Sequence, residues 1–426
     1  MATRIRDQIF VNYRVFPDQP IHGLALHAGF RCSNCGQCCR EGWHIRLTAE
    51  EADSIRRAIA ESDLHGADTD GPFTLPVSGP DGKPTECMAL DPEGVCRLQA
   101  FDEGASICRL QRYCGHEVLS SICQCYPRVA LATPGGVFVT LSNACPTAAQ
   151  ALLNPEGVDQ IDLRRHPVNE LMPRMIGHSI TGDVTPPTFG SRHTPTWEAF
   201  HYFWRWAAQW SGDHALAPSQ ALFGLGLIVG KIEQIASQIL EAPLLIDALD
   251  SMSEGFAGRL AHQRVHREPC TELGAVYADV LSGLFRCADP DLPDPFTEWR
   301  TPDGHLDRST LVRLYDQHLR PTLDEFECIE RNFVVARLLV NPLIAQATQL
   351  RTGYFLNVIG LIGLRFFALL RAETEARRLD ETHWLWAAGQ VDRLLMHRGA
   401  TKTRLLDLLD ASVRTDIRNL AQPALF

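Results

Sequence analysis

The stretch Cys32-Ser-Asn-Cys35-Gly-Gln-Cys38-Cys39 places four thiols within eight residues. Each two-residue gap lets neighbouring sulfurs face one centre, and Gly36 permits the tight turn that this requires. Thiolates are soft ligands that suit zinc, copper(I) or an iron–sulfur cluster. Adjacent cysteines do not easily bind one metal atom, so we expect Cys38 and Cys39 at different centres or on different irons of one cluster. The stretch therefore predicts a metal site in the first third of the chain.

Seven further cysteines follow before residue 146 and extend this pattern: Cys87, Cys96, Cys108, Cys114, Cys123, Cys125 and Cys145. Proline lies close to some of them, in the stretches 125–127 and 145–146, and a proline fixes the loop beside a ligand. The cation of Arg128 can neutralise an anionic cluster or hold a carboxylate. His44 and His116 are either ligands or, as is more common, structural histidines. The last three cysteines lie on or beside expected helices, where buried inert thiols are typical: Cys270, Cys287 and Cys328.

Composition places the chain among globular proteins with substantial cores. It has 426 residues, of which 45% are apolar and 21% charged, which leaves room for two or three domains. The formal net charge of −11 argues against a nucleic-acid binder, which would normally show a basic face.

The N-terminus shows no apolar stretch of the kind found in signal peptides, so we expect a cytoplasmic protein. Thiols stay reduced there, and clustered cysteines then bind metal more often than they form disulfides. A disulfide framework is the alternative, but such scaffolds are usually small and secreted. The most hydrophobic stretch, 354–370, is interrupted by Asn357 and Arg365 and is too short for a confident membrane span. It predicts a buried helix rather than a span.

The predicted fold is mainly α: a small Cys-rich, metal-binding α+β domain over 1–154, a linker or covering loop over 155–195, and an all-α helical bundle over 196–426. Within the first part, Thr48-Ala-Glu-Glu51 matches a capping box that opens a helix to about Glu61. Residues 9–16 and 135–141 have strand character, the latter as the second strand of a hairpin, and 146–153 predict a short helix. Helical periodicity covers 197–210, 219–240, 243–261, 272–286, 307–319, 323–340, 342–372, 380–397 and 401–420.

The ordered motifs together resemble a known family. They are Cys32-x2-Cys35-Gly-x-Cys38-Cys39, Gly94-Val-Cys96, Cys108-Arg-Leu-Gln, Gly115-His-Glu-x-Leu119-x3-Cys123-x2-Tyr126-Pro-Arg128 and Cys145-Pro146-x-Ala148-Ala. This order resembles the CxxCxxCC cysteine-cluster proteins, and within them the flagellin lysine-N-methylase branch, whose members also carry a helical C-terminal half. The motifs cover about a third of the chain; over the helical half, length, pattern and the stretch Glu327-Cys-Ile-Glu330-Arg-Asn332-Phe carry the resemblance.

The resemblance implies an iron–sulfur protein that holds a 4Fe–4S cluster, with zinc as the alternative metal. It also implies that the protein transfers a methyl group from S-adenosylmethionine to lysines of flagellin or a similar surface protein. Carried over by position, the ligands are Cys32, Cys35, Cys38, Cys39, Cys96, Cys108, Cys123 and Cys145. Three further candidate ligands are additional in this chain and have no counterpart in the resemblance: Cys87, Cys114 and Cys125. No residue identifies a methyl-donor pocket or a general base.

Two other functions fit the same residues. The chain can be a non-enzymatic zinc- or cluster-binding module whose helical half recruits a protein, or a redox carrier that uses the cluster for electron transfer. Iron with sulfide distinguishes a cluster from zinc, and methyl transfer distinguishes an enzyme from a binding module.

Overall fold

The fold is mainly helical, and among the described residues all the named strands precede residue 180. The computed structural model describes residues 10–11, 20–66, 72–78, 84–102, 105–155, 157–162, 175–179, 185–190, 192–262, 283, 296–304, 307–340 and 349–397. This agrees with the predicted fold class of a mainly α protein with a small sheet part in its N-terminal portion.

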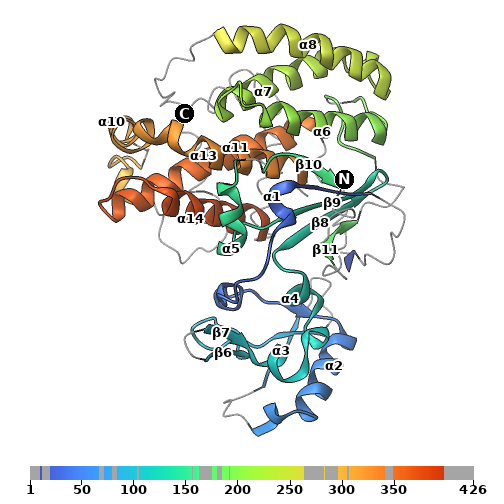
Figure 1. The fold of residues 1–426 in the computed structure, drawn as a ribbon, viewed down its shortest axis with the longest axis vertical. Helices are drawn as coiled ribbons and strands as arrows, with labels where there is room; N and C mark the ends of the chain where they lie inside the picture. Colours follow the sequence, from blue (N-terminus) through green and yellow to red (C-terminus); the bar gives the residue numbers. More distant parts are fainter. Residues whose placement is uncertain are drawn as a thin grey trace.

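Residues 32–125 form a lobe of their own, which we call the Cys lobe; it is the lower part of Figure 1. Its strands make an antiparallel sheet of order β3-β5-β4 and a separate hairpin: β3 (Arg46–Leu47), β4 (Thr74–Ser78), β5 (Pro84–Met88), β6 (Gln99–Asp102) and β7 (Ala105–Cys108). Its helices are short: η2 (Gln37–Arg40), α2 (Ala49–Ala60), η3 (Asp63–Gly66), α3 (Arg109–Cys114), η4 (His116–Val118) and α4 (Ser121–Cys125).

Helix α2 begins where the sequence predicts. Thr48 Oγ1 accepts a hydrogen bond from the Glu51 amide at 3.1 Å, and Glu51 Oε2 accepts one from the Thr48 amide at 2.9 Å, which completes the capping box. Apolar residues from α2, the strands and α3 form the core of the lobe: Leu47, Ala52, Ile55, Leu64, Met88, Leu98, Leu110 and Leu119.

A six-stranded mixed sheet of order β1-β11-β8-β9-β2-β10 lies above the Cys lobe in Figure 1. Its strands are β1 (Phe10–Val11), β2 (Ile21–Leu24), β8 (Arg128–Thr133), β9 (Gly136–Leu141), β10 (Gln160–Asp162) and β11 (Met175–Ser179). The predicted hairpin is confirmed as β8–β9, while β2–β9 and β11–β8 are parallel pairs. Three short helices flank the sheet strands in sequence: α1 (Ala25–Ala28), α5 (Pro146–Ala149) and η5 (Gln150–Leu153).

The region predicted as a linker or covering loop, 155–195, instead supplies two strands of this sheet. β10 pairs with β2, and β11 pairs with β8. In both pairs the partner strand lies far away along the chain. Strands of three and five residues are too short to show an alternating pattern, and their pairing is set by distant partners. The region is also rich in Pro, His and Arg, a composition typical of loops, so no local pattern in the sequence indicates these two strands.

The helical half follows the predicted ranges closely. Its elements are α6 (Trp197–Gly212), α7 (Pro218–Ile235), η8 (Ala236–Gln238), α8 (Ala242–His262), η9 (Thr297–Trp299), α10 (Arg308–Leu314), η10 (Tyr315–Leu319), η11 (Arg320–Thr322), α11 (Leu323–Val340), α13 (Leu350–Thr374), α14 (Glu381–Asp392) and η12 (Arg393–His397). The predicted helix over 401–420, and that over 272–286 apart from residue 283, lie outside the described residues.

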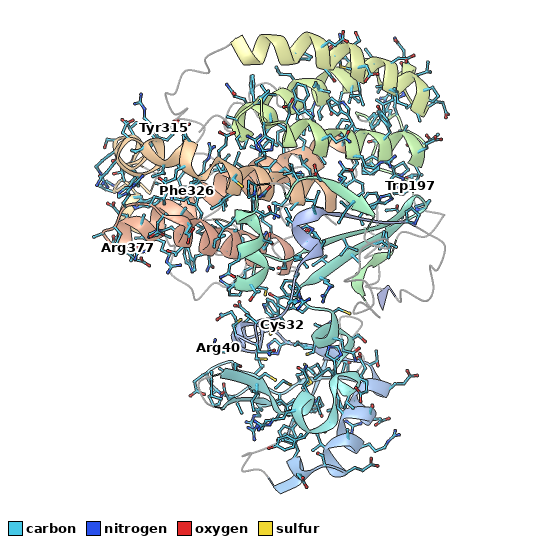
Figure 2. All side chains as sticks on the ribbon, viewed as in Figure 1. Cys32, Arg40, Trp197, Tyr315, Phe326 and Arg377 are labelled. Carbon is cyan, nitrogen blue, oxygen red and sulfur yellow. The ribbon has the colours of Figure 1, made fainter. Side chains whose placement is uncertain are left out.

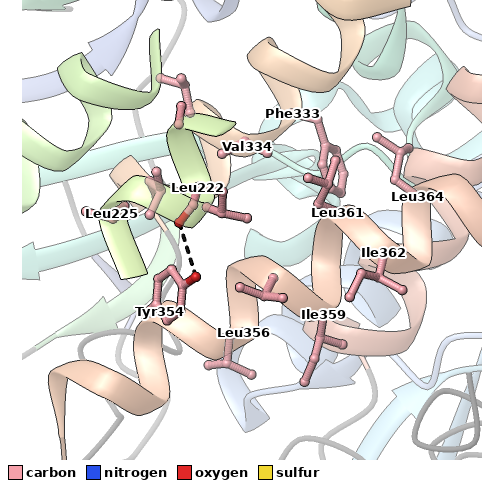
Figure 3. Close-up of a cluster of buried hydrophobic side chains, with 14 of the residues drawn as sticks. Leu222, Leu225, Phe333, Val334, Tyr354, Leu356, Ile359, Leu361, Ile362 and Leu364 are labelled. Atoms are coloured by element: carbon pink, nitrogen blue, oxygen red, sulfur yellow. Dashed lines mark hydrogen bonds between the residues drawn. The ribbon is translucent and has the colours of Figure 1, made fainter. Parts of the chain in front are cut away.

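Helix α13 runs through the core of this half, with residues 352–369 all buried. Figure 3 shows it against α7 and α11, with the Tyr354 hydroxyl donating to the Leu222 carbonyl at 3.1 Å. Among the described helices α13 alone is long and apolar enough to cross a membrane, but 94% of its most apolar window is buried inside the protein. It is the buried helix that the sequence predicts over 354–370. Its Arg365 is paired with Glu330 of α11 by two hydrogen bonds, at 2.5 and 2.6 Å.

The helical half is joined to the Cys-rich part by polar contacts around η5 and the β9–α5 loop. Asn332 of α11 donates to the carbonyls of Leu152 and Asn154 at 2.9 and 2.7 Å. The amide of Asn143, two residues before Cys145, donates to Asp392 of α14 at 2.7 Å. The stretch 327–333, which carries the resemblance in the helical half, is thus a structural junction between the two halves.

Candidate metal centre

Eight cysteines line one cavity of about 150 Å³ at the top of the Cys lobe, where the lobe meets the rest of the chain. They are Cys32, Cys35, Cys38, Cys39, Cys96, Cys108, Cys123 and Cys145. Figure 2 labels Cys32 at this junction, with further sulfur atoms below it. About 10–15 Å³ of such space admits one water molecule, so the cavity has room for more than a single ion.

The three additional cysteines do not line this cavity. Cys87 is buried on β5 and Cys125 is buried at the end of α4, while Cys114 ends α3 and points its thiol at the Ala58 carbonyl, 3.6 Å away. The structure therefore separates the cysteines that match the resemblance from those that do not.

Several different elements bring the eight thiols together. Cys38 and Cys39 lie on η2, Cys108 ends β7 and Cys123 lies in α4. Cys96 lies in the turn before β6, and Cys145 is the N-cap residue of α5. No single motif supplies the site, which is why the whole segment from 32 to 145 is needed.

Gly36 makes the turn in the middle of the Cys32–Cys39 loop. Its φ of +67° is in the left-handed region, and a Cβ there would lie 1.8 Å from Ser106 Oγ. The Gly36 carbonyl accepts a hydrogen bond at 3.1 Å from Gln99, whose side chain also donates to Ser106 at 2.7 Å. The loop is therefore folded tightly against the β6–β7 hairpin.

Aromatic side chains form the apolar wall of the cavity. Trp43 and Tyr126 meet edge to face, with ring centroids 4.9 Å apart, and both line it together with Phe30. The guanidinium of Arg128 lies 5.3 Å from the centre of the Phe30 ring. Burial lowers the pKa of Arg128, while the negative charges of Cys125 and Cys32 act against that shift. Arg128 thus places a positive charge near the thiols of Cys32 and Cys125.

Burial keeps most of the cavity thiols protonated in the metal-free protein. It raises the pKa of Cys96 to about 11, of Cys123 to about 12 and of Cys145 to about 11, and it raises that of Cys108 as well. The adjacent pair behaves differently, because a hydrogen bond from Cys39 lowers the pKa of Cys38 to about 7 and raises that of Cys39.

The donor set fits a soft metal or a cluster. All twelve cysteines that the structure describes are free thiols, so none of those that line the cavity is consumed in a disulfide. In the described part of the chain, no three Cys, His, Asp or Glu side chains are placed as the ligands of one metal ion. Thiolates on one ion converge on a point, whereas those of a cluster end on different irons and stand further apart. Eight thiols around one cavity are twice the four that a single zinc ion takes, so the number of donors fits a cluster better.

The two histidines considered as ligands, His44 and His116, are exposed and do not line the cavity. Sequence reasoning missed a different contact: Glu41, two residues after Cys39, forms an ion pair with Arg393 at the end of α14, with both nitrogen–oxygen distances at 2.6 Å. These residues are 352 positions apart, and no local signal in the sequence connects them.

A second cavity, of about 320 Å³, lies apart from the thiols, between the β8–β9 turn and the start of α6. Its lining is aromatic and basic: Pro20, His22, Pro134, Gly135, Phe138, Trp197, Glu198, His201 and Arg205. Burial lowers the pKa of His201 to about 4, so its imidazole is neutral at pH 7. Since no cysteine lines this cavity, it is separate from the metal site.

Comparison with protein-family models, with curated proteins and with solved structures finds no match to this chain. The family resemblance therefore rests on the ordered cysteine motifs themselves.

Proposed function

We propose that this chain is an iron–sulfur protein that transfers a methyl group from S-adenosylmethionine to lysine side chains of flagellin or a similar protein. The observation that supports a cluster most directly is the cavity, which is lined by all eight cysteines of the resemblance and by none of the additional three. The methyl-transfer step is proposed from the resemblance. A bound cluster would supply Lewis-acid or redox chemistry at the cavity.

The residues around the cavity suit an amine acceptor. A lysine can attack a methyl donor only as the neutral amine, and an apolar environment lowers the pKa of an ammonium group. Trp43, Tyr126 and Phe30 supply that environment, and the nearby cation of Arg128 acts in the same direction. The aromatic faces also suit the sulfonium of the methyl donor, because cations are attracted to aromatic rings.

Tyr126 has a limited role in proton transfer. Burial raises its pKa, and the negative charges of Cys145 and Cys38 raise it further. Its phenol therefore stays protonated at pH 7, so it can donate a hydrogen bond but does not act as a base.

Metal and sulfide analysis of anaerobically purified protein tests the cluster. We expect iron and acid-labile sulfide together, with broad visible absorbance. Zinc without sulfide would contradict the iron–sulfur part and favour the binding module.

Methyl transfer is tested with isotope-labelled S-adenosylmethionine and flagellin, with modified lysines located by mass spectrometry. We expect labelled lysines with wild-type protein and with Cys114→Ser, which keeps a donor for the Ala58 carbonyl, and none with Cys145→Ala. A correctly assembled cluster that methylates none of several candidate proteins overturns the enzymatic proposal. Reversible reduction of that cluster without methylation favours a redox carrier.

A further inference from the structure

The thiols around the cavity are divided between two packing groups. Cys96, Cys108 and Cys123 pack against the core of the Cys lobe, beside residues such as Leu98, Leu110 and Leu119. Cys145 belongs to a different cluster, made of Phe30, Leu141, Cys145 and Ala148, with Tyr126 packed against it. The cavity therefore has one wall in the lobe and another in the part that follows it.

The Cys32–Cys39 loop is itself shared between these walls. At its far end the Cys39 carbonyl accepts a hydrogen bond from the Cys96 amide at 2.8 Å, which ties Cys38 and Cys39 to the lobe. At its near end the hydroxyls of Ser33 and Thr147 are 2.5 Å apart, which ties Cys32 and Cys35 to the loop of Cys145.

Gly36 separates the part of the loop that contacts the Cys145 loop from the part that contacts the Cys lobe. Its left-handed turn separates Cys35 from Cys38, and its carbonyl is held by Gln99 of β6. Two cysteines therefore lie on each side of this turn and face different neighbours.

We propose that the chain holds two metal centres. A five-thiol group within the Cys lobe, Cys38, Cys39, Cys96, Cys108 and Cys123, saturates the first with protein ligands. A three-thiol group at the junction, Cys32, Cys35 and Cys145, holds the second and leaves it one position for an exogenous Lewis base.

The three-thiol group has the features of a reactive rather than a structural site. Structural metal sites use four protein ligands, and catalytic sites keep an open position. Cys32 and Cys35 are exposed, so the junction side of the cavity is open to solvent, and Arg128 places a cation beside Cys32. This assignment rests on the proposed metal site and locates its reactive part.

The test compares Cys35→Ala and Cys96→Ala with wild type and with the control Cys114→Ser, all reconstituted anaerobically. Iron, sulfide and the electron paramagnetic resonance spectrum of the reduced protein are measured before and after addition of cyanide as the probe base. We expect Cys35→Ala to keep about half of its iron, if both centres are clusters of equal size, and Cys96→Ala to keep most of it, because four thiols remain in its group to ligate a cluster. Cyanide should change the spectrum of wild type and of Cys96→Ala, and should leave that of Cys35→Ala unchanged.

Loss of all iron from a folded Cys35→Ala, or a cyanide response that survives in it, overturns the two-centre assignment. If Cys96→Ala does not fold, a second experiment takes its place. Wild-type protein is titrated with zinc, and thiol alkylation with mass spectrometry shows which cysteines the metal protects at each step. We expect the two groups to become protected in separate steps, and one common step for all eight thiols contradicts the assignment. A wild-type chain that binds no metal overturns both this assignment and the proposed cluster, whereas two centres without methyl transfer overturn only the enzymatic proposal.

Discussion

At the scale of single residues, the buried thiols make the metal-free protein sensitive to alkaline pH. Thiols of an unfolded chain titrate near about pH 8.5, whereas burial raises the pKa of Cys96 and Cys145 to about 11 and of Cys123 to about 12. Between those values the folded chain binds more protons than the unfolded chain, so its stability falls as the pH rises. Cys38 acts in the opposite direction between about pH 7 and about 8.5, since its pKa is lowered to about 7.

We therefore expect the melting temperature of the reduced, metal-free protein to fall from pH 8.5 to pH 10.5. Differential scanning calorimetry across that range measures it. Metal loading should weaken the trend, because the ligands are then deprotonated in the folded state as well. A melting temperature that is level across the range would show that the three thiols are solvated.

Gly36 provides a second test at this scale. Gly36→Ala combines a left-handed backbone, which costs about 1 kcal/mol, with a Cβ placed 1.8 Å from Ser106 Oγ and 2.3 Å from Gln99 Nε2. We expect it to lower the free energy of unfolding by about 2–4 kcal/mol and to reduce metal loading.

Gly94→Ala is the matched control for that variant. Gly94 also has a positive φ, of +80°, but the nearest atom to its added Cβ is 3.7 Å away. Its cost should stay near about 1 kcal/mol. Equal losses in the two variants, measured by urea unfolding, would mean that the contact of Gly36 with the β6–β7 hairpin is unimportant.

At the scale of elements, the Asn332 side chain is the main polar tie between α11 and η5, beside a longer contact of 3.7 Å from the Cys328 thiol to the Leu152 carbonyl. Asn332 is 1% exposed, and its amide donates to the carbonyls of Leu152 and Asn154. Asn332→Ala removes both of these hydrogen bonds and leaves the Leu152 carbonyl only the thiol of Cys328, and we expect a loss of about 1–3 kcal/mol in the free energy of unfolding. Gln160→Ala, which removes an exposed hydrogen bond to the Arg205 carbonyl, should change it by less than about 0.5 kcal/mol. Similar losses in both would contradict the junction role of Asn332.

Elements with strong local signals could be predicted from the sequence, and elements fixed by distant partners could not. Helix α2 starts at its capping box, and α6, α7, α11 and α13 follow the apolar periodicity. β10 and β11 have no such signal, because their positions depend on pairing with β2 and β8. The stretch 74–78, β4, also lacks a strand signal, in its case because the surrounding sequence is rich in Gly, Pro and Asp, although it pairs with the neighbouring strand β5.

The candidate site shows the same limit. The sequence identifies the eight cysteines and predicts that Cys38 and Cys39 do not easily share one metal atom. It does not say which distant thiols accompany each end of the loop, because contacts such as Ser33 with Thr147 join residues 114 positions apart. Which thiols lie beside each end of the loop is set by these long-range contacts, and they form only when the chain folds.

At the scale of the whole molecule, the ion pair of Glu41 with Arg393 joins the Cys lobe to the end of α14. Its side chains are 7% and 23% exposed, so it lies between a surface pair and a buried one. A double-mutant cycle with Glu41→Gln and Arg393→Met should give a coupling energy of about 1–3 kcal/mol by urea unfolding.

The pair of Arg56 with Glu86 is the control for that cycle. It lies within the Cys lobe, and its side chains are 48% and 29% exposed. Its coupling energy should be below about 1 kcal/mol. A coupling for Glu41 with Arg393 no larger than this would mean that the ion pair does not hold the lobe in place.

The hydrogen bond from the Asn143 amide to Asp392 has a consequence for biosynthesis. Its two residues are 249 positions apart, and Asp392 is also held by Arg337 at 2.8 Å. A chain emerging from the ribosome exposes Cys32 and Cys35 early, yet the loop that carries Cys145 gains its anchor only after α14 has been synthesised. Metal delivered during translation would meet a complete five-thiol group and an incomplete three-thiol group. If the chain holds the two proposed centres, we expect the junction centre to be filled last, once α14 has been synthesised.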